Sequence, residues 1–307
     1  MITYYQKTIT TRKLKTLAEF KVGSWIHVED PTEDELLQLE TDFKLDRGLL
    51  SDAIDPYEVP RVEEDGGTTY IFTRIPYEEE GKIFTAPVLL GVSGSFVFTV
   101  CKKKLQFFEH FIAFRISFFT TQKVRFLLQM LLEIDGAYAR YVTRINKEVR
   151  RLSAELSMTI SNRDIIHFME YETVLHDLLD ALVPTNAALQ KLLSGKFLTL
   201  RDEDKEFAED VYLGNGQLIE LCHSNLRTIV NTRNSYSTIM SNNLNRVIKL
   251  LTSITIVLMV PSIFMNMYGM NVPLPFTSSP HAFWIVILVS GVVTGGVLYI
   301  FKRKEWL

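Results

Sequence analysis

Apolar residues gather near the C-terminal end of the chain in two long runs. No Lys, Arg, Asp or Glu occurs between Leu250 and Phe301. Within this stretch the runs Leu250–Gly269 and Ala282–Phe301 would each extend about 30 Å as helices, which matches the hydrocarbon core of a bilayer. The pattern therefore predicts two transmembrane helices, over 250–269 and 282–301, joined by a short loop at 270–281.

The first hundred residues alternate short β-type runs with helical ones, which indicates an α/β domain over 1–120. Thr32 and Glu35, which follow Pro31, form a capping-box pattern and predict the start of a helix. Strands are predicted where β-branched and aromatic residues concentrate, at 24–28, 69–75, 83–92 and 95–100.

Helical periodicity replaces this alternation from about Gln122 onward. Two helices are predicted, over 122–156 and 163–193, the second bent at Pro184 and ended by Gly195, and we expect them to pack as a hairpin within 121–201. A third helical run begins near Asp202 and has no turn signal before the first apolar run. One helix of about 100 Å would then carry a stalk, 202–249, directly into the membrane.

The charged residues decide the expected orientation. Arg246 and Lys249 precede the first span, a basic tail at 302–307 follows the second, and the loop between the spans has neither Lys nor Arg. By the positive-inside rule both termini face the cytoplasm, so we expect a multi-pass protein of the cell membrane. Residues 1–17 have no apolar core and do not resemble a signal peptide.

Composition narrows the function classes further. The formal net charge of −3 gives no support for nucleic-acid binding. The two cysteines, Cys101 and Cys222, lie far apart in sequence and are interpreted as small buried side chains in a reducing compartment. No Gly-x-x-x-x-Gly-Lys pattern is present, so no nucleotide partner is expected, and no nucleophile motif suggests an enzyme.

Polar residues recur along one face of the first predicted span. This face could meet water while the opposite face meets lipid or protein. The hydroxyl groups could instead bond backbone carbonyls or a neighbouring helix, so the pattern alone leaves both interpretations open. Steps of three or four residues select the face as Asn245, Ile248, Thr252, Thr255, Met259, Ser262 and Asn266.

A short motif, Tyr268-Gly269-Met270-Asn271, stands at the outer end of the first predicted span. The chain closes on Phe301–Leu307, and it also contains Trp25–Thr32, Pro60–Glu64 and Ser241–Asn245. With these segments at their expected places, the whole chain resembles the CorA family of magnesium transporters. The resemblance implies a funnel-shaped homopentamer in which the first span of each copy lines a central pore and the second span packs outside it.

The resemblance also implies roles for single residues. Tyr268, Gly269, Met270 and Asn271 would form the selectivity filter, with the Asn271 side-chain oxygens contacting hydrated Mg²⁺, a hard cation that holds its water tightly. Gly269 would supply unusual backbone conformations at the helix end, and Met270 would pack. Asn245 and Asn266 are further contacts for the water shell of the ion, and apolar constrictions are expected at Ile248, Leu251 and Met259.

Regulation by cytosolic Mg²⁺ is a further implication. Glu78 and Asp210 match the acidic pair that would bind regulatory Mg²⁺ between copies, with Glu79 or Glu80 as alternatives to Glu78. The loop 272–281 has no carboxylate, whereas many family members have an acidic residue there.

The expected function is passage of Mg²⁺, with Co²⁺ or Ni²⁺ as lesser substrates. A zinc transporter of the same superfamily is the first alternative, against which Met270 argues. A membrane-tethered cytoplasmic sensor without a pore is the second alternative.

Overall fold

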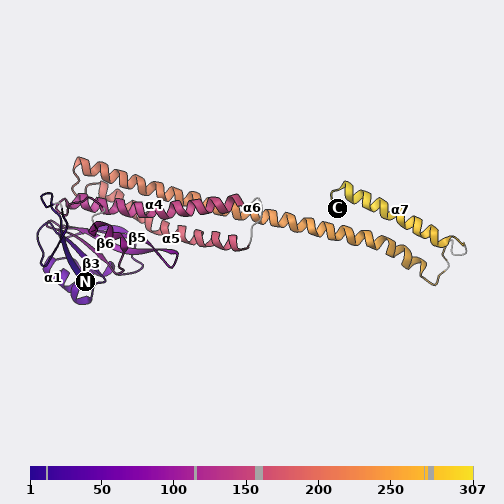
Figure 1. Cartoon of the computed structure of the whole chain (residues 1–307), viewed down its shortest axis with the longest axis horizontal. Coiled ribbons are helices and arrows are strands. Elements are labelled where there is room, and N and C mark those ends of the chain that lie inside the picture. Colours follow the sequence, from indigo (N-terminus) through magenta and orange to yellow (C-terminus); the bar gives the residue numbers. More distant parts are fainter. Residues whose placement is uncertain (12, 114–115, 156–161, 273, 276–279, 307) are drawn as a thin grey trace. The chain divides into compact units, whose positions relative to one another are not determined.

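The computed structural model describes residues 1–11, 13–113, 116–155, 162–272, 274–275 and 280–306 (Figure 1). The chain divides into two compact units, Met1–Asn231 and Thr232–Leu307. The first unit holds a sheet with helices on both faces, and the second unit is a pair of long apolar helices.

The described part of the first unit contains a seven-stranded mixed sheet in the order β2-β1-β3-β7-β6-β5-β4. β3 and β7 pair in parallel, and the other neighbours pair antiparallel. The strands are β1 (Ile2–Gln6), β2 (Lys15–Leu17), β3 (Trp25–Glu29), β4 (Arg61–Asp65), β5 (Thr68–Glu79), β6 (Lys82–Val92) and β7 (Val97–Cys101).

Four of these strands confirm the predicted ones, and three were missed. β2 and β4 are short, lie at the two ends of the sheet order and carry charged or exposed residues, so their composition gave no signal. β1 is a short run of partly buried residues that the prediction missed although it contains β-branched and aromatic side chains. β4 and β5 join through Gly66 and Gly67, which both have positive φ angles, of 54° and 75°. Glycine suits such a hairpin turn because it has no Cβ to oppose that conformation.

The first helix and the long helices follow the sequence prediction closely, whereas the short helices over 47–52 and 106–112 were not predicted. Thr32 caps the first helix through the expected capping box with Glu35. The third predicted helix begins at Asp202 and continues without interruption to Tyr268. Leu156 and Leu307, which the predictions included, lie outside the described residues. The helices are α1 (Glu33–Phe43), α2 (Arg47–Asp52), α3 (Gln106–Ile112), α4 (Lys123–Glu155), α5 (Asn162–Leu193), α6 (Asp202–Tyr268) and α7 (Ala282–Arg303).

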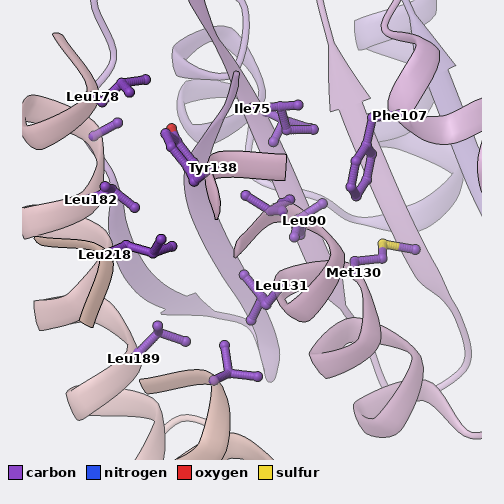
Figure 2. Packing of buried hydrophobic residues seen from close by; sticks show 14 of the residues in the cluster. Ile75, Leu90, Phe107, Met130, Leu131, Tyr138, Leu178, Leu182, Leu189 and Leu218 are labelled. Atoms are coloured by element: carbon purple, nitrogen blue, oxygen red, sulfur yellow. The ribbon is translucent and has the colours of Figure 1, made fainter. Parts of the chain in front are cut away.

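Alternate residues of the central strands supply two separate apolar cores. Tyr70, Phe72 and Phe98 face α1 and α2. Ile71, Ile75 and their neighbours on β6 face α4, α5 and the first part of α6, where leucines of the three helices meet the sheet (Figure 2). The period of two along a strand therefore puts helices on both faces of the sheet. Cys101 and Cys222 are free and buried, as predicted, and burial raises the pKa of both thiols to about 12.

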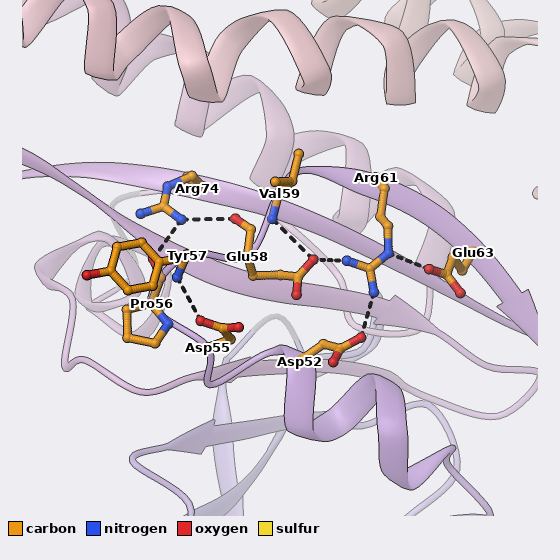
Figure 3. A network of polar contacts seen from close by, with 9 residues as sticks. All are labelled: Asp52, Asp55, Pro56, Tyr57, Glu58, Val59, Arg61, Glu63 and Arg74. Carbon is orange, nitrogen blue, oxygen red and sulfur yellow. Dashed lines mark hydrogen bonds and ion pairs between the residues drawn. The ribbon is translucent and has the colours of Figure 1, made fainter.

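Two arginines fasten the segment between α2 and β4 onto the sheet (Figure 3). The Arg74 guanidinium donates to the carbonyl oxygens of Pro56 (3.0 Å) and Glu58 (2.9 Å) and to Thr85 Oγ1 (2.9 Å). The Arg61 guanidinium lies over the Phe72 ring and forms ion pairs with three carboxylates. The distance from Arg61 Nη2 to Asp52 Oδ2 is 2.7 Å. The remaining partners of Arg61 are Glu58 and Glu63.

Candidate ion pathway

The second unit contains the apolar part of α6 and the helix α7. Both helices are long and apolar enough to cross a membrane, and only 6% and 11% of their apolar windows are buried inside the chain. A core helix of a soluble protein would be mostly buried, so this exposure favours lipid or other subunits as the surroundings. Both predicted apolar runs therefore lie in helices with the properties of membrane spans.

One stripe of each helix is covered by the other. On α6 the less exposed positions recur at helical spacing, with Ser253 fully buried and Val257, Val260, Phe264 and Tyr268 partly buried. On α7 the matching stripe includes the buried Val286 and Ser290 and the partly buried Thr294. Figure 1 shows α7 returning along α6. These two stripes form the seam of a helical hairpin.

The polar face that the sequence selected lies on roughly the opposite side of α6 from this seam, at 3.6 residues per turn. Its apolar members are widely exposed within the chain, Ile248 by 51% and Met259 by 59%, and Leu251, the third expected constriction, is 65% exposed. Its polar members are exposed as well. They are Asn245, Thr252, Thr255, Ser262 and Asn266.

Two hydroxyl groups of this face bond the helix itself. Thr255 Oγ1 donates to the carbonyl oxygen of Leu251 at 2.9 Å, and Ser262 Oγ donates to that of Leu258 at 3.1 Å. Bonding to backbone carbonyls is one of the two interpretations that the sequence left open. It does not exclude contact between these hydroxyl groups and water. A hydroxyl that donates its hydrogen keeps lone pairs that accept from a water molecule.

The motif begins at Tyr268, the last residue of α6, and continues beyond the helix end. The N–H of Gly269 donates to the carbonyl oxygen of Met265 at 3.0 Å, and the N–H of Met270 donates to that of Met267 at 3.3 Å. Gly269 does not have a positive φ angle, and an added Cβ there would lie 3.4 Å from the nearest atom. The backbone of Gly269 is therefore not in the left-handed region in the single chain, and its expected role in the filter stays a prediction.

The side chains of the motif differ in their surroundings. Tyr268 is partly buried, and its hydroxyl donates to the carbonyl oxygen of Pro275 at 3.2 Å, which ties the following loop to the helix end. Met270 was expected to pack but is 58% exposed, and Asn271 is exposed beside it. Within the loop, residue 273 and residues 276–279 lie outside the described part, so the missing carboxylate remains an observation on the sequence.

The two carboxylates expected to bind regulatory Mg²⁺ lie on different elements. Glu78 is near the end of β5, and its Oε2 accepts from Arg144 Nη1 of α4 at 2.9 Å. Asp210 is exposed on α6. Among the described residues no group of three or more His, Cys, Asp or Glu side chains is arranged to hold a metal ion. The regulatory role of Glu78 and Asp210 therefore stays a prediction.

The two alternatives to Glu78 differ in their surroundings. Glu79 Oε2 accepts from Lys103 Nζ at 2.8 Å. Glu80 forms the turn between β5 and β6 together with Gly81 and has a positive φ angle of 51°. Sequence reasoning missed both Arg144 and Lys103, because the partners of a carboxylate on another element cannot be identified from spacing.

A buried polar pair in the first unit was also missed. Asp135 of α4 is 7% exposed and accepts a hydrogen bond of 3.2 Å from Asn215 of α6, which is fully buried. A signal for it exists in the sequence, because Asp135 interrupts the apolar stripe Leu128, Leu131, Tyr138 and Val142 at helical spacing.

Comparison with known proteins agrees with this geometry. The cobalt/magnesium transport protein CorA of Methanocaldococcus jannaschii is 26% identical over 294 residues, which cover 92% of this chain and 91% of that protein. The protein of the same name from Thermotoga maritima is 20% identical over 313 residues, which cover 98% of this chain and 88% of the relative.

The fold is also that of a solved structure. The complete structure of the CorA magnesium transporter from Methanocaldococcus jannaschii matches with a TM-score of 0.88 at 22% identity, and the match covers 100% of this chain and 99% of the other. The family model described as CorA-like Mg²⁺ transporter protein matches residues 20–303. This match spans both units and both apolar helices, and the chain therefore belongs to the family of CorA-like Mg²⁺ transporters.

Proposed function

We propose that copies of this chain surround a pore through which Mg²⁺ enters the cytoplasm, and that α6 lines this pore. The observation that supports the proposal best is the direction of the polar face of α6. The face lies away from the seam with α7, is exposed in the single chain, and leads to the motif Tyr268-Gly269-Met270-Asn271.

A single hairpin of two helices cannot enclose a water-filled path, so several copies must cover the polar face. In hydrocarbon that face would carry amide groups without partners, which is unfavourable. We infer a homopentamer, as the family resemblance implies. In this assembly residues 202–249 form a cytoplasmic stalk, 250–269 and 282–301 form the spans, and 270–281 form the external loop. The basic residues flanking the spans keep both termini in the cytoplasm.

The proposed filter suits an ion that keeps its water. Mg²⁺ loses its octahedral water shell reluctantly, so neutral oxygens that accept from that water recognise it well. Asn271 from each copy would supply a ring of such oxygens at the outer mouth. Below it, Asn266, Ser262 and Thr255 offer further acceptors. Ile248, Leu251 and Met259 narrow the path with apolar side chains that close by losing water. Co²⁺ and Ni²⁺ are lesser substrates.

Feedback by cytosolic Mg²⁺ is the second part of the proposal. Glu78 of one copy and Asp210 of the next would hold the ion, which relieves repulsion between their carboxylates and keeps the closed state. Arg144 already neutralises Glu78 within its own chain at 2.9 Å. The regulatory ion must therefore compete with Arg144, which would weaken its binding.

The competing functions have less support. The family match and the curated relatives do not favour the zinc-type alternative. A tethered sensor would leave the polar face of α6 without a role. The family consists of ion transporters, and we propose that the chain performs no catalysis and needs no cofactor besides the cation that it carries.

Uptake by reconstituted protein tests the pore. Liposomes that contain a magnesium-sensitive dye would hold wild type, Asn271→Ala, or the control Asn234→Ala, whose side chain is exposed in the stalk part of α6, about three turns before Asn245. We expect uptake with wild type and the control, and loss of uptake with Asn271→Ala. Equal uptake by all three would contradict the filter, and silence for every cation would favour the tethered sensor.

A further inference from the structure

The pair of Asp135 and Asn215 joins α4 to α6 inside the first unit. Asn215 Nδ2 donates to Asp135 Oδ1 at 3.2 Å, and both side chains are more than nine-tenths buried. The remaining oxygens, Asp135 Oδ2 and Asn215 Oδ1, are buried and have no hydrogen-bond partner among the described residues. Buried polar atoms without partners are rare in folded proteins, so these two oxygens need an explanation.

A count of donors and acceptors suggests one. An ionised carboxylate only accepts hydrogen bonds, and the oxygen of the Asn amide also only accepts. Two acceptors cannot satisfy each other. A proton on Asp135 Oδ2 turns that oxygen into a donor. The Asn215 amide, whose nitrogen already donates to Asp135 Oδ1, offers its own oxygen as the acceptor. An acid and an amide arranged in this way can close a ring of two hydrogen bonds.

We propose that Asp135 is a neutral carboxylic acid in the folded chain, and that its proton closes a clasp with Asn215 that fastens α6 to α4. The clasp is a proton site with no part in the ion pathway.

The groups around Asp135 agree with a neutral acid. On α4, Tyr138 interacts electrostatically with Asp135, and its hydroxyl donates to the backbone oxygen of Arg74 on β5 at 3.0 Å. On α6, the buried thiol of Cys222 also interacts with Tyr138. α5 contributes apolar side chains such as Leu182 and Leu189 (Figure 2). The Arg74 guanidinium is engaged with Pro56, Glu58 and Thr85.

No neighbouring charge therefore offsets the cost of burying an ionised Asp135 side chain. Burial raises the pKa of Asp135 to about 7 from its ordinary value of 3.8, and the hydrogen bond from Asn215 opposes the rise. Because the folded state holds the proton more tightly than the unfolded state, the contribution to stability is fully present below pH 3.8 and is lost as the pH rises to about 7. Ionisation then leaves a buried charge facing the Asn215 oxygen.

The clasp has a consequence for regulation, which rests on the proposed function. α6 is one continuous helix from the clasp to the motif at its end. A proton that fastens its first part to α4 opposes any movement of α6 needed for opening. We therefore expect the flux of Mg²⁺ to rise as the cytoplasmic pH increases through about 7.

The variant Asp135→Asn tests the clasp directly. Its amide has the shape of the neutral acid and supplies an N–H to Asn215 Oδ1, so it keeps both hydrogen bonds without a titratable proton. The matched control is Asp42→Asn, which changes an exposed carboxylate of α1. Each full-length protein would be studied in detergent micelles by infrared difference spectroscopy and thermal unfolding, from about pH 4 to about pH 8.

For wild type and the control we expect a carboxylic-acid carbonyl band that disappears as the pH rises through about 7, together with a decrease in Tm over the same interval. Asp135→Asn should fold, lack the band, and lose that decrease. A band that is absent near pH 5, or an Asp135→Asn variant that fails to fold or has a lower Tm than wild type at that pH, would overturn the neutral acid and indicate an ionised carboxylate held by water or a cation.

Flux measurements separate this inference from the proposed function. If wild type carries Mg²⁺, its flux should rise with pH, and Asp135→Asn should show low flux without that rise. A clasp confirmed by infrared spectroscopy with a flux independent of pH would overturn the regulatory part alone. Absence of any flux in wild type would contradict the proposed function and leave the spectroscopic test of the proton intact.

Discussion

Arg144 offers a sharp test of the regulatory carboxylates. Its Nη1 lies 2.9 Å from Glu78 Oε2, and the two side chains are 48% and 37% exposed. If Glu78 binds regulatory Mg²⁺, this ion pair competes with the divalent cation for the same carboxylate. Replacing Arg144 with Gln removes the competing charge, so less Mg²⁺ should be needed to close the pore.

The size of the effect follows from the exposure of the pair. An ion pair at the protein surface contributes about 0.2–1 kcal/mol, because water and salt screen it. At about 1.4 kcal/mol per factor of ten, its loss should strengthen Mg²⁺ binding by about 1.4- to 5-fold at each site. The gain should shrink as the salt concentration rises, since screening already weakens the pair.

The assay is the concentration of Mg²⁺ on the cytoplasmic side that halves the flux in liposomes. Arg144→Gln should lower this concentration about 1.4- to 5-fold. Arg151→Gln, which breaks a pair with Glu148 on the same helix, is the matched control and should leave it unchanged. If Arg144→Gln leaves the half-inhibiting Mg²⁺ concentration unchanged or raises it, the reasoning is refuted. It is also refuted if Arg144→Gln has the same effect in a protein that already carries Glu78→Gln.

Two further predictions concern single contacts. In Gly91→Ala the new Cβ would lie 2.0 Å from Phe98 Cζ in the sheet, so we expect a loss of about 1–3 kcal/mol, measured as a lower Tm, whereas Gly94→Ala meets no atom within 4 Å and should be neutral. Tyr268→Phe loses the hydrogen bond to the Pro275 oxygen, about 0.5–1.5 kcal/mol, and should reduce Mg²⁺ flux by loosening the loop. The exposed Tyr299→Phe is its control, and equal flux in both would contradict this role.

Local patterns were sufficient for the elements that carry the pathway. The start of α6 at Asp202, the capping box at Thr32 and the start of α7 at Ala282 were all predicted. Helical periodicity and capping depend on neighbours a few residues apart, so the sequence contains their signals. β2 and β4 were missed because short strands with charged residues have little strand signal of their own, and β1 was missed although it contains β-branched and aromatic residues.

Part of the candidate site could likewise be identified from sequence, and part of it could not. The motif at 268–271 and the polar face of α6 could be identified from sequence, because both lie on one continuous helix and its end. The direction of that face relative to α7 could not, since it depends on which side of α6 the returning helix covers. The roles of these residues in selecting the ion stay predictions, as do the regulatory roles of Glu78 and Asp210.

The sequence by itself determined the two apolar spans, the long helix that leads into them, and the motif between them, because apolar length and helical period are properties of consecutive residues. Only the tertiary structure decided that Arg144 neutralises Glu78, that Asp135 meets Asn215, and that Ser253 faces the seam with α7. These contacts join residues far apart along the chain, and the burial that shifts the Asp135 pKa exists only after the helices have packed.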